Sequence, residues 1–245
     1  MKLLILRSSS CVSVWRCEGV WRRGLFSGGK EEKSEKKKQI WAEIDKGYFA
    51  DLHEFRRNRG KRTEAPDHLC SIGESVMFPA VSGSSLSGQS LSLPPRGSSP
   101  SGQSLPPYSL VSLILVSMRG LGMAMCEKYR APFEREFARK QSVGVYEMSL
   151  LDKGVFRLIQ GWVERNLRKK IDPQRQSSFL VCSEGVESVK SGLAIGNSIV
   201  GYAYLVDKEG RVRWKAHATP NEREIKALIK CTKTLMNDSK NSNNR

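Results

Sequence analysis

The sequence predicts an α/β domain in which parallel central strands meet an antiparallel edge. The most informative stretch, residues 200–214, holds two extended runs around a turn. Gly210 can adopt the positive φ that a short hairpin loop needs, and Asp207 can hydrogen-bond the turn backbone. An amphipathic helix pattern follows this hairpin directly, and the mainly apolar run 109–116 is typical of a buried central strand. Together these three observations place the fold in the α/β class.

The front of the chain is typical of a mitochondrial transit peptide. Residues 1–27 are rich in arginine and serine and contain one acid, Glu18. We expect processing near Leu25 or Phe26. Residues 28–79 are predicted to form a basic linker and an amphipathic helix, because apolar residues recur at spacings of three and four from Ile40 to Phe55.

The stretch 80–108 is of low complexity. Ser-Gly-Gln-Ser-Leu occurs at 87–91 and again at 101–105, and prolines follow each copy. Serine, glycine and proline at this density bury too little apolar area to offset the entropy of ordering. We therefore expect this segment to be a disordered insertion.

Residues 109–236 are predicted to form the folded domain. After the first strand we expect a helix at 121–129 that ends near Pro132, with Phe133 and Phe137 continuing its packing face. A second strand at 143–149 is expected to contribute Val143, Val145 and Tyr146 to the core.

A second helix is predicted at 153–169, with a short strand at 179–181 inside the otherwise polar stretch 172–190. The final helix is expected to have Thr219 as its N-cap, Pro220 at its first position and Glu222 in the capping box. We expect residues 237–245 to form a polar tail. Strand, helix, strand, helix, hairpin and helix is a thioredoxin-like order.

The sequence provides few groups for catalysis. A thioredoxin-like enzyme carries its reactive cysteine where the first core strand meets its helix, but the junction 117–122 has no cysteine, and Cys126 lies further along the helix. None of the six cysteines forms a Cys-x-x-Cys pair, and the three histidines lack metal-ligand spacing. We therefore expect a protein that is not an enzyme and that needs no metal, cofactor or small-molecule substrate.

The formal net charge of +16 suits mitochondrial import, nucleic acid or an anionic lipid surface, and does not choose among them. Two alternatives to a binding protein stay open at this point. One is a thiol peroxidase or reductase that uses Cys126 or Cys182. The other is a mitochondrial RNA-binding protein, although basic and aromatic residues do not interleave as they do in an RNA-recognition sheet.

Two candidate surfaces follow from the residue pattern. The hairpin supplies possible partner contacts, although core packing and a solvated edge explain these residues more simply. A basic cluster after the amphipathic helix suits an anionic membrane surface or a solvated tail. The hairpin candidates are Tyr202, Tyr204, Arg211, Arg213 and Trp214, and the basic candidates are Arg56, Arg57, Arg59, Lys61 and Arg62.

The hairpin pattern Gly-Tyr-x-Tyr-Leu-Val-Asp-x-x-Gly-Arg-Val-Arg-Trp, with the Thr-Pro-Asn-Glu helix start, resembles the mitochondrial ATPase complex subunit ten family. Three further segments agree with this family, and the resemblance covers roughly residues 40–79 and 109–236. The chain departs from the family pattern after Met77-Phe78-Pro79. The three segments are Lys46 to Asp51, Tyr129 to Phe133 and Tyr146 to Ser149.

The resemblance implies a peroxiredoxin-like domain that lacks the catalytic cysteine. It also implies an assembly chaperone that binds newly made subunit a of the ATP synthase Fo sector and promotes its joining to the c ring. Such a protein would be peripheral to the inner mitochondrial membrane on the matrix side, and nucleic acid would not be a partner.

Overall fold

The computed structural model describes residues 49–58, 60–61, 63–95, 109–138, 140–151 and 160–242. All of them belong to one unit of the chain, Tyr48–Arg245. The predicted transit peptide, most of the predicted amphipathic helix and residues 152–159 lie outside the described residues. The described end of that helix is helical over 49–57, as predicted.

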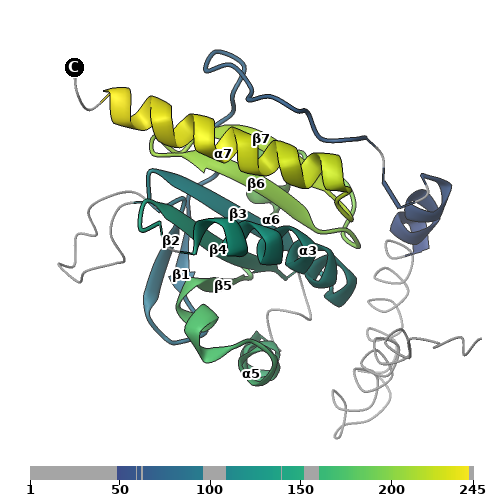
Figure 1. Cartoon of the computed structure of the whole chain (residues 1–245). Helices are drawn as coiled ribbons and strands as arrows, with labels where there is room; N and C mark the ends of the chain where they lie inside the picture. The colour runs from purple at the N-terminus through teal and green to yellow at the C-terminus, as the bar shows by residue number, and fades with distance from the viewer. Residues whose placement is uncertain are drawn as a thin grey trace, which may run out of the picture. The chain divides into compact units, whose positions relative to one another are not determined.

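A five-stranded mixed sheet forms the centre of the domain (Figure 1). Its strands are β3 (Val111–Ser117), β4 (Val143–Leu150), β5 (Phe179–Cys182), β6 (Tyr202–Asp207) and β7 (Val212–His217). They lie in the order β5-β4-β3-β6-β7; β3 is parallel to β4 and β4 to β5, whereas β6 is antiparallel to β3 and to β7. Leu113 pairs with Val145 on one side and with Leu205 on the other. This topology confirms the predicted thioredoxin-like arrangement.

Helices cover both faces of this sheet. Figure 1 shows α3 and α7 in front of the sheet and α6 behind it. The helical elements are α3 (Gly120–Phe137), α5 (Gln160–Lys170), the 3-10 helix η2 (Pro173–Ser178), α6 (Val186–Gly192) and α7 (Glu222–Ser242). No helix in the described ranges is both long and apolar enough to cross a membrane.

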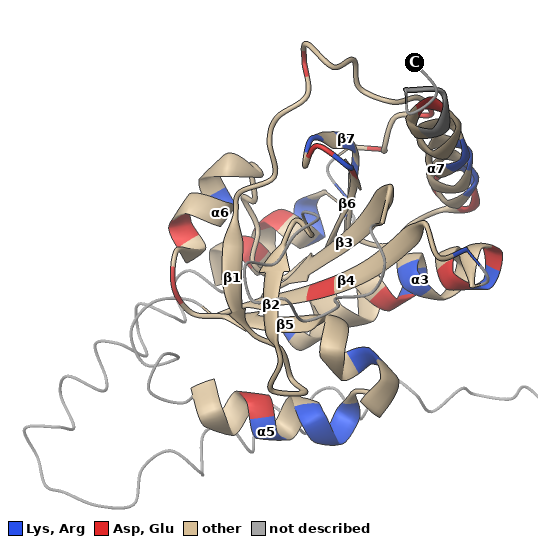
Figure 2. Cartoon of the chain, turned by 90° about the vertical axis from the view of Figure 1, so that its left-hand side faces the viewer, with Lys and Arg blue, Asp and Glu red and all other residues tan. Residues whose placement is uncertain are grey.

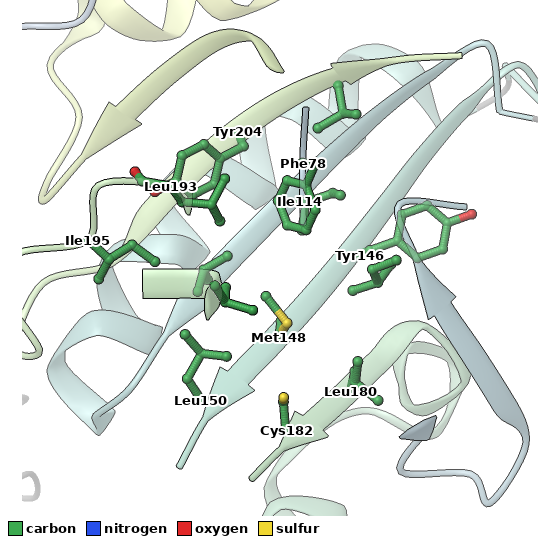
Figure 3. Packing of buried hydrophobic residues seen from close by; sticks show 14 of the residues in the cluster. Phe78, Ile114, Tyr146, Met148, Leu150, Leu180, Cys182, Leu193, Ile195 and Tyr204 are labelled. Carbon is green, nitrogen blue, oxygen red and sulfur yellow. Dashed lines mark hydrogen bonds between the residues drawn. The ribbon is translucent and has the colours of Figure 1, made fainter. Parts of the chain in front are cut away.

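Each face of the sheet has its own core. On one face, Leu113 and Trp214 pack against Phe133 of α3 and Leu228 of α7. On the other face the sheet packs against α6 and against residues that precede β3 (Figure 3). That second core includes Phe78, Leu91, Leu93, Ile114, Tyr146, Met148, Val186, Val189, Leu193 and Tyr204.

The predicted disordered segment contains an ordered hairpin. Strands β1 (Val81–Ser84) and β2 (Ser90–Leu93) pair antiparallel, and the Leu86 amide donates 2.9 Å to the Phe179 carbonyl on the open edge of β5. Leu91 and Leu93 are 3 % and 1 % exposed. The prediction was wrong here because these alternating leucines bury against the sheet, which outweighs the polar composition of the local sequence. Residues 96–108 lie outside the described residues.

The opposite edge of the sheet is covered by residues 63–78, which we call the strap. The Cys70 amide donates 2.8 Å to the Arg213 carbonyl, and the Val212 amide donates 2.8 Å to the Val76 carbonyl. The Phe78 amide bonds the Gly210 carbonyl, also at 2.8 Å. Because an open edge strand invites pairing with other chains, coverage of both edges protects the sheet from aggregation.

Two predicted helix ends also differ from the structure. Helix α3 continues through Pro132 to Phe137, because Phe133 and Phe137 are buried on the sheet and this packing compensates the amide hydrogen bond that proline cannot make. Helix α7 extends to Ser242, through part of the predicted polar tail 237–245.

The capping pair of α7 lies two residues later than predicted. The Glu224 amide donates 2.9 Å to Asn221 Oδ1, and the Asn221 amide donates 3.0 Å to Glu224 Oε2. This reciprocal pair does what Thr219 and Glu222 were expected to do.

Candidate functional site

The candidate site is the corner where β3 ends, α3 begins and the loop 193–201 enters β6. Thioredoxin-like chemistry would lie here, because the helix N-terminus stabilises a thiolate. Backbone approaches backbone closely at this point: a Cβ on Gly122 would lie 2.9 Å from the Val200 carbonyl oxygen, and one on Gly201 would lie 2.7 Å from Cys126 Sγ. Glycine is therefore required at both positions for α3 to seat against β6.

Among the cysteines in the described ranges, Cys126 lies at this corner, and it is a buried structural thiol. Its residue is 3 % exposed, and its Sγ donates weakly to the Val116 carbonyl at 3.5 Å and to the Tyr202 carbonyl at 3.8 Å. Burial, and next the nearby Glu147 carboxylate, raises the pKa of this thiol to about 12. A reactive cysteine needs a depressed pKa and access to solvent, so this environment opposes thiolate chemistry.

Cys182, the other candidate thiol, is also buried. Its Sγ donates 2.9 Å to the Glu184 carbonyl, and burial raises its pKa above the usual value. Both candidate thiols are therefore protonated at neutral pH.

Helix 49–57 is anchored at the same corner by polar bonds. The Asp51 carboxylate accepts the Ser198 amide at 2.9 Å and the Ser198 hydroxyl. Asn197 Nδ2 donates to the Asp51 carbonyl at 2.9 Å and to Glu54 Oε2 at 3.2 Å. Arg119, at the start of α3, donates from Nε to Ser198 Oγ at 3.3 Å. A helix from the front of the chain thus occupies the corner where a thiol enzyme would receive substrate.

Asn197 and Ser198 were missed by the sequence analysis. Each is 9 % exposed, yet the surrounding sequence shows no periodicity that separates these polar residues from a solvated loop. The available signal was Asp51, which lies in one of the segments that agree with the family pattern.

A cavity of about 230 Å³ adjoins the corner. Helix 49–57 contributes Glu54 and Phe55, the loop contributes Asn197, and β7 contributes Lys215 and His217. The lining mixes acidic, basic and amide groups, so the cavity suits polar contacts of a protein segment better than an apolar ligand.

Two of the hairpin candidates belong to the core. Tyr204 is 2 % exposed and its hydroxyl donates 3.3 Å to the Leu193 carbonyl. Trp214 is 1 % exposed and its Nε1 donates 2.7 Å to the Pro66 carbonyl of the strap. The expectation that they contact a partner was wrong, because each ring is buried in the core on one face of the sheet and has its polar atom bonded.

The remaining hairpin candidates are partly accessible. Arg213 donates 2.9 Å from Nε to the Cys70 carbonyl and lies 3.5 Å from Asp207, so it holds the strap. Tyr202 is half-buried, and its hydroxyl donates 3.0 Å to the Asn197 carbonyl. Arg211 is half-buried beside the hairpin turn and remains a candidate partner contact.

The residues of the predicted basic cluster differ in their exposure and pairing. Arg56 and Arg57 are exposed, as a membrane-facing role requires. Lys61 instead forms an ion pair with Glu224, so its charge is neutralised inside the fold. Arg59 and Arg62 lie outside the described residues.

The strap carries an apolar patch that the sequence analysis did not single out. Ile72, Val76 and Met77 are 62 %, 52 % and 44 % exposed. Met77 also pairs with Arg211 at the hairpin turn, so the patch adjoins the hairpin. We call these three residues the strap patch. Clustered exposed apolar side chains are typical of interaction surfaces.

Comparison with known proteins gives consistent matches along the chain. The family model described as ATP10 protein matches residues 17–235. A protein of Eremothecium gossypii named mitochondrial ATPase complex subunit ATP10 is 23 % identical over 230 residues, covering 90 % of this chain and 79 % of the relative. Its namesake in Saccharomyces cerevisiae is 25 % identical over 226 residues, covering 87 % and 78 %.

Among solved structures, BsSco, a member of the Sco family of cytochrome c oxidase assembly proteins, aligns with a TM-score of 0.44 and 14 % identity over 66 % of this chain and 94 % of that one. A thiol:disulfide interchange protein DsbE from Chlorobium tepidum aligns with a TM-score of 0.41 and 10 % identity, covering 66 % and 96 %.

Proposed function

Since this chain belongs to the ATP10 protein family, we propose that it assists assembly of the mitochondrial ATPase complex as a chaperone without catalysing a reaction. In this role it binds newly made subunit a of the Fo sector until that subunit joins the c ring. The observation that carries the proposal is the family match over residues 17–235, which includes helix 49–57, the strap and the whole sheet.

The corner geometry supports a binding role over a catalytic one. Cys126 and Cys182 are buried thiols with raised pKa values, and Asp51 and Ser198 fill the corner with mutual hydrogen bonds. A thiol peroxidase or reductase would need a low-pKa thiol that peroxide or a disulfide can reach. No comparable observation favours RNA binding.

The strap patch is the surface that we assign to the client. A membrane subunit exposes apolar segments before assembly, and Ile72, Val76 and Met77 offer apolar area in return. Full burial of such a side chain contributes about 1.5–3 kcal/mol, so covering the exposed half of all three contributes about 2–4 kcal/mol. This range suits a chaperone, which must bind its client and then release it.

We further propose that the protein acts at the matrix side of the inner membrane as a peripheral protein. The predicted transit peptide over residues 1–27 and the net charge of +16 support this location. Exposed Arg56 and Arg57 are available for lipid contact.

The test is recovery of subunit a by the tagged full chain. Mitochondria are pulse-labelled for newly made organelle-encoded proteins and solubilised, and the bound proteins are then identified. We expect selective recovery of subunit a. We also expect Ile72→Ser to lower that recovery about fivefold, since it removes an exposed apolar contact of roughly 1 kcal/mol or more.

Leu121→Ser is the matched control, because Leu121 is an isomer of isoleucine, is 38 % exposed and lies outside the strap. Its recovery of subunit a should equal that of the unmodified chain. Recovery of RNA or of thiol-exchange partners without subunit a would contradict the proposed function. Equal losses in both variants would contradict the assignment of the strap patch.

A further inference from the structure

Helix α5 concentrates positive charge on the molecular surface. Its sequence Gln160–Lys170 contains four cations and one carboxylate, Glu164. Figure 2 shows these basic residues gathered along α5. Arg165, Arg168, Lys169 and Lys170 are all exposed. We call these four residues the α5 basic face.

The α5 basic face is held firmly on the body of the domain. Val163 and Leu167 are buried beneath it. Arg168 Nε donates 2.7 Å to the Leu86 carbonyl, and Gln176 Nε2 donates 3.0 Å to the carbonyls of Arg168 and Ile171. The last turn of the helix is thereby tied to two neighbouring segments, so the backbone that carries these cations is fixed to the domain.

Several basic residues elsewhere in the described ranges form ion pairs. Arg130 bonds Glu127 and Glu134, Lys233 lies 2.5 Å from Glu136, and Arg175 lies 2.6 Å from Glu147. On α5, Arg168 lies 3.8 Å from Glu164, the one carboxylate of this helix.

Helix stability explains only part of this pattern. Cations in the last turn favour the negative end of the helix dipole, which accounts for Lys169 and Lys170. Arg165 lies in the middle of α5, where the dipole effect has faded, and it has no ion pair with any described residue. Ion pairing among the described residues therefore does not explain its exposed charge.

We propose that the α5 basic face is the surface by which this protein docks on an anionic phospholipid bilayer. The inference rests on the proposed location at the inner membrane and names the contact surface for it. Phosphate headgroups complement the four cations in charge, and each well-placed cation strengthens adsorption several-fold.

The burial of Val163 and Leu167 determines how α5 docks. An interfacial amphipathic helix inserts its apolar face among the acyl chains, but on α5 the apolar side chains of Val163 and Leu167 are buried within the protein. Docking is therefore electrostatic, without insertion, and must weaken steeply with salt.

A lipid surface fits this face better than a nucleic acid does. Tight nucleic-acid binding takes many phosphate contacts along a groove or stripe, usually with aromatic side chains that stack on bases. The α5 basic face offers four cations on two turns, and Trp162, the aromatic residue on the same helix, is half-buried.

The experiment is flotation of the full chain with vesicles of phosphatidylcholine alone or with one third phosphatidylglycerol. The test variant is Arg165→Gln with Lys169→Gln, which removes two exposed cations four residues apart. The control is Lys226→Gln with Lys230→Gln, a pair with the same spacing and exposure on α7. Equal unfolding midpoints establish that both variants are folded.

We expect the unmodified chain to bind the anionic vesicles and not those of phosphatidylcholine alone. The partition coefficient should fall about thirtyfold for the α5 variant and no more than about threefold for the control. Raising the salt from 50 to 300 mM should release the unmodified chain. Equal losses in the two variants would overturn the inference, since net charge would then suffice. The inference would also be overturned if the α5 variant bound the anionic vesicles as well as the unmodified chain does. The same holds if that variant lost binding to single-stranded RNA while keeping vesicle binding. Because subunit a is absent from this assay, failure here leaves the proposed chaperone role to its own test.

Discussion

Glu224 connects the front of the chain to the last helix, and its replacement tests whether that connection stabilises the fold. Its side chain is 2 % exposed. It pairs with Lys61 and accepts the Ala65 amide at 2.7 Å and the Asn221 amide at 3.0 Å. Burial alone would raise its pKa, but the bonds from Lys61 and the two amides outweigh burial and hold the pKa of Glu224 below its usual value.

Glu224→Gln keeps the shape of the side chain and removes its charge. The amide group retains one acceptor oxygen but directs an N–H₂ toward a donor, so at least one charge-assisted bond is lost and Lys61 is left without its counter-charge. A hydrogen bond to a charged group contributes about 1.5–3 kcal/mol, and breaking a buried ion pair costs about 3–5 kcal/mol. We therefore expect the free energy of unfolding to fall by about 3 kcal/mol.

Urea unfolding followed by tryptophan fluorescence measures this loss. Trp214 bonds the Pro66 carbonyl, so release of the strap should alter its emission. Glu222→Gln is the control, because Glu222 is exposed in the same helical turn, and it should change stability by less than about 0.5 kcal/mol. A loss under about 1 kcal/mol for Glu224→Gln, or equal losses for both variants, would refute the reasoning.

Because the folded pKa of Glu224 is depressed, its contribution to stability should depend on pH. That contribution should be complete above the unfolded pKa of about 4.3 and should disappear as the pH falls through the lower folded pKa. The unmodified protein should therefore lose more stability on acidification than Glu224→Gln does. Cys126 should resist iodoacetamide at pH 8 until the protein is unfolded in urea, as mass spectrometry of the modified peptide can show; modification at the rate of a free thiol would contradict its burial. Gly201→Ala should lower the melting temperature by roughly 5–10 °C, because its Cβ would fall on the Gly122 carbonyl oxygen, and an unchanged melting temperature would show that α3 can shift without cost. Asp51→Asn should weaken the bonds to Ser198 and speed proteolysis around residues 58–63; equal cleavage rates would show that helix 49–57 is held by other contacts.

The strand order could be predicted because it depends on patterns local to each element. The apolar run at 109–116 and the turn at Asp207 and Gly210 each specify a strand or a hairpin, and their order along the chain limits the topology to few arrangements. The missing cysteine at the 117–122 junction was equally visible, since it depends on composition at one predicted site.

The accessibility of the candidate residues could not be predicted in the same way. Tyr204 and Trp214 alternate along their strands as surface contacts would, but both faces of this sheet are covered, so alternation does not distinguish inside from outside. The strap patch escaped notice because Ile72, Val76 and Met77 follow no helical or strand period, and only the path of the strap along β7 leaves them exposed.

The sequence by itself determined the family, the thioredoxin-like order and the absence of a cysteine where that order would use one. These features depend on residue identity and on spacing within short windows. The tertiary structure alone decided that a serine- and leucine-rich hairpin, β1–β2, covers one edge of the sheet and that Glu224 and Lys61 meet across more than 160 positions. Such contacts join segments far apart in the chain, and their free energy arises from burial and pairing that no local pattern records.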